Sequence, residues 1–154
     1  MKTAVSFRFA KIVIILIFIQ SSSCSANQGF PRVELDLKGK LYQIEIADTN
    51  ERKTQGLMYR RAIGRNAGML FPYDAPVNLN IWMKNTLMPL AVIWLDEQAR
   101  VIDKKILQPC RTPGCPSFGP AKLSMYVLEL HPAELDRFSI GDRLASIIDW
   151  KSSR

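Results

Sequence analysis

Histidine and cysteine are scarce in this chain: 154 residues include one histidine, His131, and three cysteines. A zinc site usually needs four ligands. Two of the cysteines together with the single histidine fall short of that number, so we predict no metal and no cofactor. The sequence also lacks a Gly-x-Ser-x-Gly elbow, a His-Glu-x-x-His pair and a phosphate-cradling glycine loop. The sequence therefore matches none of the common motifs of hydrolases, metalloproteases and nucleotide-binding proteins. His131 precedes Pro132 at an expected helix start, which favours a structural role for it.

Long apolar runs are also missing. The longest at the N-terminus covers residues 12–19, whereas a membrane-spanning helix needs about 20 apolar residues. Lys2, Arg8 and Lys11 stand before or beside this run and small residues follow it, which is the pattern of an export signal. We therefore predict a signal peptide over residues 1–26 and a periplasmic or other cell-envelope location.

Two cleavage modes remain open for this signal. Cys24 follows three serines and resembles the lipidated cysteine of a bacterial lipoprotein, although Ser21 stands where Leu is usual. Cys24-Ser25-Ala26 also fits the small-x-small pattern of ordinary signal peptidase, which would release a chain starting at Asn27. We favour lipidation slightly, because it gives an otherwise odd cysteine a role and would attach the protein to a membrane.

The mature chain is small and mildly basic. About 130 residues suffice for one domain with its own core but not for two, so we expect a single β-rich domain over 27–154. The formal net charge falls from +7 for the whole chain to +4 without the signal, with 18 Lys and Arg against 14 Asp and Glu. This excess suits an anionic partner, and nucleic acid is not expected for an exported chain. The sequence does not decide the oligomeric state.

Alternating apolar residues predict a β-hairpin over 33–47 that turns at Gly39. Further strands are predicted at 68–71, 78–83, 90–96, 100–107, 123–129 and 143–149. Two short helices are predicted, one over 49–55 with Asp48 and Glu51 in capping-box spacing and Gly56 as its stop, and one over 132–138. These elements predict a mainly β fold: a compact single-domain β sandwich or barrel with two short helices.

Cys110 and Cys115 bracket a Pro113-Gly114 pair, whose position is typical of a type II turn. Such a turn folds the chain back on itself, so we predict a structural disulfide in an oxidising compartment. Free or functional thiols are the alternative.

One predicted strand end concentrates an aromatic and several polar side chains. Alternation over 78–84 puts Leu79, Ile81 and Met83 on one face and Asn78, Asn80, Trp82 and Lys84 on the other. The first face is ordinary core. The second is suited to a polar ligand, or it forms a second packing layer from which Lys84 reaches water.

Several motifs, in order along the chain, resemble those of the domain-of-unknown-function 192 family. They are Glu51-Arg52 with Gln55-Gly56-Leu57-Met58 and Arg60, Gly68 to Phe71, Trp82 to Thr86 with Pro89-Leu90, Pro109-Cys110, Cys115-Pro116, Val127 to Leu130, and Gly141-Asp142. The resemblance implies a compact β-rich domain that is often exported, and it supplies no catalytic mechanism. Ala91 departs from the family pattern, which usually has Asp there.

We select six ligand-binding candidates: Arg52, Arg60, Trp82, Lys84, Asn85 and Thr86. The two arginines lie in a family-like motif, and their guanidinium forks suit a carboxylate or phosphate. We therefore predict an extracytoplasmic, non-enzymatic binding or accessory domain for a polar, potentially anionic, envelope ligand. The alternatives are a cell-envelope hydrolase or transferase that uses the Lys84-Asn85 region, and a structural or protein-partner module.

Overall fold

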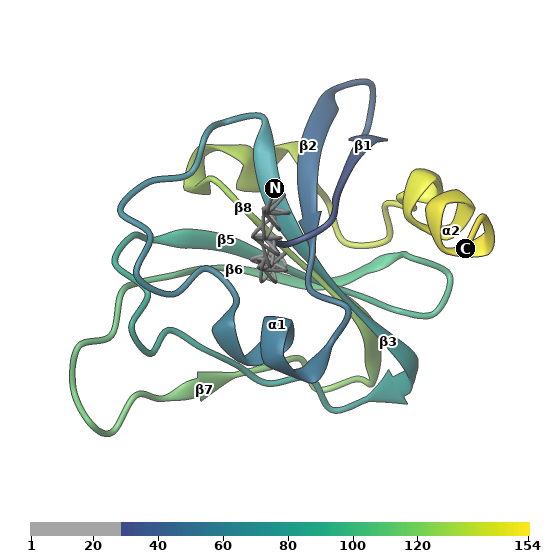
Figure 1. Ribbon diagram of the computed structural model, residues 1–154. Helices are drawn as coiled ribbons and strands as arrows, with labels where there is room; N and C mark the ends of the chain where they lie inside the picture. The colour runs from purple at the N-terminus through teal and green to yellow at the C-terminus, as the bar shows by residue number, and fades with distance from the viewer. Residues whose placement is uncertain (1–28) are drawn as a thin grey trace, which may run out of the picture.

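The computed structural model describes residues 29–154, so the predicted signal peptide and Cys24 lie outside the described residues. A six-stranded mixed sheet forms its centre (Figure 1). In spatial order its strands are β1 (Arg32–Asp36), β2 (Leu41–Ile46), β3 (Ala67–Val77), β8 (Ser124–Leu130), β5 (Leu90–Leu95) and β6 (Val101–Leu107). Only the β2–β3 pair is parallel within this sheet. The sheet is open, with β1 and β6 at its two edges.

The predicted hairpin at the start of the domain is confirmed. β1 and β2 pair antiparallel, and the Leu37 N–H donates to the Lys40 carbonyl at 2.9 Å across a two-residue turn. Both turn residues have positive φ, 60° at Lys38 and 76° at Gly39. Such turns match the twist of the flanking strands, so Gly39 relieves strain at one of the two positions.

A parallel pair needs a crossover, and the segment between β2 and β3 supplies one that carries α1 (Asn50–Gln55). Thr49 caps this helix, because its hydroxyl accepts the Arg52 N–H at 3.2 Å. The predicted cap at Asp48 is wrong, since that carboxylate instead pairs with the Arg52 side chain. Gly56 ends the helix with φ of 46°, as predicted.

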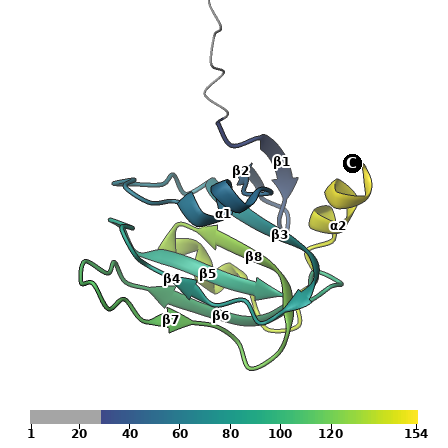
Figure 2. The ribbon, with the colours of Figure 1, turned by 60° about the horizontal axis from the view of Figure 1, so that its bottom comes forward.

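Both faces of the sheet are covered. One face packs with η1 (Pro132–Arg137), a 3₁₀ helix, and with α2 (Ala145–Ser152), which lies beside β1 at the side of the molecule (Figure 1, Figure 2). The other face packs under α1 and a two-stranded sheet of β4 (Ile81–Trp82) and β7 (Ser117–Phe118). Side chains of the central strands alternate between the two cores, so even β5, buried along its whole length, serves both.

The mainly β prediction is confirmed, and both predicted helices exist, the second as η1. The strand expected at 143–149 is wrong, because this segment forms α2, a third helix. Leu144 and Ile147 are both buried and stand three residues apart, about one helical turn. A strand would send positions three apart to opposite faces, so the common core contact of this pair favours the helix.

The strand expected at 78–83 shortens to β4, and the one expected at 68–71 extends into the longer β3. The predicted alternation nevertheless holds around β4. Leu79 and Met83 are buried, whereas Trp82 and Lys84 are exposed. Trp82 and Lys84 therefore lie on the same, solvent-facing side of this segment, as expected.

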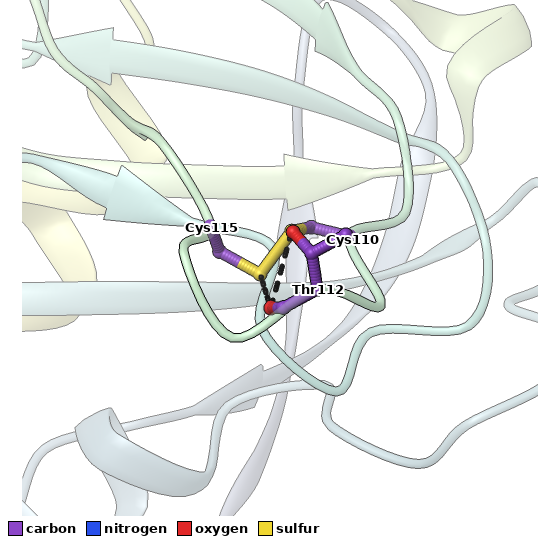
Figure 3. The surroundings of a disulfide bond; sticks show 3 residues. All are labelled: Cys110, Thr112 and Cys115. Atoms are coloured by element: carbon purple, nitrogen blue, oxygen red, sulfur yellow. Dashed lines mark hydrogen bonds between the residues drawn. A yellow bond between two sulfur atoms is a disulfide. The ribbon is translucent and has the colours of Figure 1, made fainter.

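A disulfide joins Cys110 and Cys115, with their Cα atoms 5.7 Å apart, as predicted (Figure 3). Thr112 lies against the bridge, its carbonyl oxygen 3.2 Å from Cys115 Sγ. The type II turn is wrong, because Gly114 does not adopt the positive φ that such a turn requires. The loop is also tied to the strand region of Lys84, since the Cys110 N–H donates to the Met83 carbonyl at 3.3 Å.

Candidate functional site

A small pocket of about 100 Å³ opens between α1, β4 and the covered face of the central sheet. We call it the α1–β4 pocket and define it by Lys53, Trp82, Lys84, Thr86 and Glu129. Lys53 comes from α1, Trp82 from β4, and Glu129 from the central strand β8. Three of these residues, Trp82, Lys84 and Thr86, were selected from the sequence as binding candidates. Lys53 and Glu129 were not.

Glu129 lies deepest among the charged groups of the pocket, with only 5% of its surface exposed. Its neighbours across the sheet are Met69 of β3 and Val92 of β5, which offer it no hydrogen-bonding side chain. Alternation along β8 turns Glu129 toward the α1 side, whereas Leu128 and Leu130 face the opposite core. A single carboxyl group therefore projects from an apolar strand into the pocket.

The Glu129 carboxyl makes no hydrogen bond or ion pair with any residue from 29 to 154. Within that range, Ser124 Oγ is the one fully enclosed side-chain oxygen that lacks a partner, so the Glu129 oxygens retain access to the pocket. Burial without compensation raises the pKa of Glu129 to about 8. The group is therefore largely protonated at neutral pH and can both donate and accept a hydrogen bond.

Two ammonium groups stand nearer to solvent. Lys84 is exposed and lies over the Trp82 ring, 5.0 Å from its centroid. Lys53 is half-buried and lies 4.1 Å from the centroid of the Tyr73 ring, which also lines the pocket. The aromatic faces hold both cations by cation–π attraction. The pocket is thus positive toward its mouth and has an ionisable acid at its base.

Thr86 adds a hydroxyl to the wall. It is 5% exposed, and its N–H donates to the Met83 carbonyl at 3.1 Å, which closes the turn after β4. Asn85, the residue before it, has φ of 57° and points elsewhere. Its side-chain amide donates to Tyr59 Oη at 2.8 Å, and its carbonyl accepts the Tyr59 N–H at 2.8 Å. Asn85 thus ties the turn to the segment after α1 and does not line the pocket.

The two candidate arginines also lie outside the pocket lining. Arg52 donates to Asp48 Oδ1 at 2.7 Å. Arg60 forms a two-pronged pair with Glu45 at 3.1 and 2.6 Å. Burial acts to raise the pKa of Glu45, and the Arg60 bonds outweigh it and lower that pKa. The structure does not bring the arginines to Lys84. Their assignment as ligand-binding residues stays a prediction, and neither arginine lines the α1–β4 pocket.

Sequence reasoning missed Glu129 as a site residue, although its segment figured in the family-like motifs. The available signal was one charged residue inside the apolar run of β8, Ser124–Leu130. Such a residue is expensive to bury, so its presence in an apolar strand points to function or to a buried partner. Pairing with a distant cation would have explained it equally well. Only the fold shows that no such partner exists among the described residues.

Residues 29–154 contain neither a cluster of metal-binding side chains nor a helix that could span a membrane. No group of three or more His, Cys, Asp or Glu side chains could hold a metal ion there. The helices of this part of the chain are all too short or too polar to span a bilayer.

The fold and pocket together define a small mixed-sheet domain with an acid placed below two lysines. The chain belongs to the DUF192 family, described as Uncharacterized ACR, whose model matches residues 33–146. A UPF0127 protein of Thermococcus kodakarensis is 29% identical over 96 residues, which are 61% of this chain. The chain spans 58% of the length of that relative.

Two solved structures share the fold. A protein of unknown function from Novosphingobium aromaticivorans is 26% identical, with a TM-score of 0.66 over 77% of this chain and 87% of that one. A Sinorhizobium meliloti protein, provisionally described as a transcription regulator, is 27% identical, with a TM-score of 0.63 over 75% and 93%. These likenesses confirm the β-rich fold, and the match to the family model confirms the family resemblance.

Proposed function

We propose that this protein is an extracytoplasmic binding domain that holds a small polar ligand with an anionic group in the α1–β4 pocket. The observation that carries the proposal is the placement of two lysines, Lys53 and Lys84, on one small pocket. Neither lysine forms an ion pair within residues 29–154, so both charges remain available to a ligand.

The pocket suits a small molecule more than a polymer. Its volume of about 100 Å³ accommodates a ligand of a few heavy atoms or the end of a longer one. Trp82 is 45% exposed and presents its ring beside Lys84, where it can cover the apolar part of a ligand. The hydroxyl of Thr86 offers a hydrogen bond deeper in the wall. Aromatic side chains with a small number of placed polar or charged groups are usual features of small-molecule sites.

An enzyme of the cell envelope is the second candidate, and Glu129 is the observation that favours it. A binding site has no need of a proton-transfer group, yet the pocket that contains Lys84 also contains a carboxyl whose pKa is about 8. Acids with a pKa near the working pH are effective proton donors and acceptors. In this alternative Glu129 transfers a proton while Lys84 stabilises a developing anion.

The Lys84→Met variant tests the binding proposal. We expect propionate and inorganic phosphate to shift NMR signals of the pocket residues in the mature wild-type domain, and the apparent Kd to rise about tenfold in the variant. A lost charge-assisted contact of about 1.5 kcal/mol corresponds to that factor. The melting temperature should barely change, because an exposed cation contributes little to folding.

Lys122→Met is the matched control, since Lys122 is an exposed lysine that does not line the pocket. It should leave both the Kd and the stability unchanged. Absence of binding by both anions, or equal weakening by both variants, would remove the proposal. A large stability loss in Lys84→Met without a binding defect would indicate a structural role for the lysine.

A further inference from the structure

We propose that the ligand of the α1–β4 pocket is a small amino-carboxylate, whose carboxylate meets Lys84 and Lys53 and whose ammonium group meets Glu129. This inference rests on the proposed function, because it takes the lysines as the anion-binding part of the pocket. It adds that the ligand carries a positive charge, which meets Glu129 at the base of the pocket.

The pocket has opposite polarity at its two ends. Lys84 is exposed and Lys53 half-buried, whereas Glu129 is 5% exposed, so the cations lie outside and the acid inside. A ligand that is only an anion satisfies the outer end and leaves the carboxyl of Glu129 without a charged partner. A ligand that carries both charges a few atoms apart satisfies both ends, and the pocket volume of about 100 Å³ limits it to a short carbon chain.

The lining between the ends also favours an ammonium group. Phe71, Tyr73 and Trp82 contribute three aromatic rings to one small pocket. Aromatic faces attract cations, as the positions of Lys53 over Tyr73 and Lys84 over Trp82 already show. A buried carboxyl without a partner is costly for the empty protein. A cation that enters the pocket removes part of that cost by pairing with it.

Such binding releases a proton. Glu129 is largely protonated in the empty pocket at neutral pH, and an ammonium group pairs with its ionised form. Three other titratable groups face the same space: Lys53 of α1, Tyr73 of β3 and Lys84 after β4. Burial raises the pKa of Tyr73 above its usual value of 10, so this phenol stays protonated. We therefore assign any proton released between pH 6 and pH 8 to Glu129.

Three matched sets of probes test the proposal on the mature protein by calorimetry. They are β-alanine and 4-aminobutyrate, then propionate and butyrate, which lack the amino group, and finally propylamine and butylamine, which lack the carboxylate. We expect the amino-carboxylates to bind at least tenfold more tightly than either single-charge set. Titrations in two buffers with different ionisation enthalpies should show release of up to one proton per ligand at pH 7. Affinity should rise with pH and level off above about 8.

Glu129→Gln provides the second arm, since it keeps the shape of the side chain and removes its charge. We expect it to weaken the amino-carboxylates about tenfold or more, to leave propionate and butyrate unchanged, and to abolish proton release. Its melting temperature should equal or exceed that of the wild type at pH 8, because the cost of burying an ionised group disappears. A folded variant can therefore be expected.

The two proposals fail in different ways. If propionate binds as tightly as β-alanine, if binding takes up protons, or if Glu129→Gln binds β-alanine normally, the amino-carboxylate assignment is wrong. The anion-binding proposal survives in that case, provided that Lys84→Met still weakens propionate. If no probe binds, or if Lys84→Met affects none of them, the pocket function itself is wrong.

Discussion

The pKa values of two buried glutamates of this protein shift in opposite directions. Glu129 has no partner within residues 29–154, and burial raises its pKa to about 8. Glu134, 1% exposed at the start of η1, also suffers burial, which acts to raise its pKa. Hydrogen bonds from Lys40, Tyr42 and Arg65 outweigh that effect and lower it to about 2. Glu134 is thus paired within the fold, whereas the carboxyl of Glu129 is buried without a partner among these residues.

Glu134→Gln should destabilise the protein by about 2 kcal/mol at pH 7, because charge-assisted hydrogen bonds are lost. The folded pKa lies below that of the unfolded chain, so the contribution of Glu134 is present above about pH 4.5 and disappears as the pH falls toward 2. Chemical denaturation at pH 7 and at pH 3 should therefore show a smaller difference between variant and wild type at the lower pH.

Glu97→Gln is a suitable comparison for that measurement, since Glu97 is exposed in the turn before β6. It should change the unfolding free energy by less than about 0.5 kcal/mol. An equal effect of both substitutions, or a pH-independent effect of Glu134→Gln, would show that the cluster around Glu134 contributes nothing specific.

At the scale of elements, the wall that carries Trp82 and Lys84 is short and needs support. β4 has two residues and pairs with the two residues of β7. The Cys110 N–H adds a hydrogen bond to the Met83 carbonyl, and the disulfide closes the loop that leads to β7. Trp94 Nε1 also donates to the Leu79 carbonyl at 2.9 Å from the core side. These contacts fix one wall of the pocket, and α1 and the segment after it form the other.

Replacement of Cys110 and Cys115 together by Ser should lower the unfolding free energy by about 2 kcal/mol, as expected for a loop this short. Neither cysteine defines the polar base of the pocket, so binding of propionate to the folded variant should stay within about threefold of wild type. Denaturant titration and calorimetry on the same sample measure both quantities. Lost binding with unchanged stability would instead favour functional thiols.

At the scale of the whole molecule, residues 29–154 form one folded unit with a core on each side of the sheet. This unit starts after the predicted signal peptide, so removal of residues 1–26 takes away none of the described elements. The position of the fold is compatible with either cleavage mode, and the chemistry of the N-terminus remains a prediction.

The intact mass of the protein from its native host decides that chemistry. We expect a diacylated or triacylated chain that begins at Cys24, and a mass that starts at Asn27 would indicate a secreted form instead. An unprocessed chain that retains Met1 would contradict both forms of the export prediction. Detergent partitioning of the same sample should place the lipidated form in the detergent phase.

The local pattern of the sequence determined much of this protein. Alternation identified the β1–β2 hairpin and the outward side of Trp82 and Lys84, because strand geometry is a local property. The bridge between Cys110 and Cys115 was predicted correctly, although the type II turn on which the prediction rested does not form. Family-like motifs covered the domain in order, and the family match confirms them.

Tertiary structure decided the rest. Arg52 and Arg60 looked suited to an anion, but their guanidinium groups pair with carboxylates of the protein itself, Asp48 four residues before Arg52 and Glu45 of β2. The strand expected at 143–149 does not form: only Arg143 makes a bridge, to Arg100 just before β6, and the apolar residues that follow pack as α2. The burial of Glu129 depends on the position of β8 between β3 and β5, because strands on both sides keep water and partners away from its carboxyl group. Burial and partner choice depend on contacts across the fold, which no local pattern specifies.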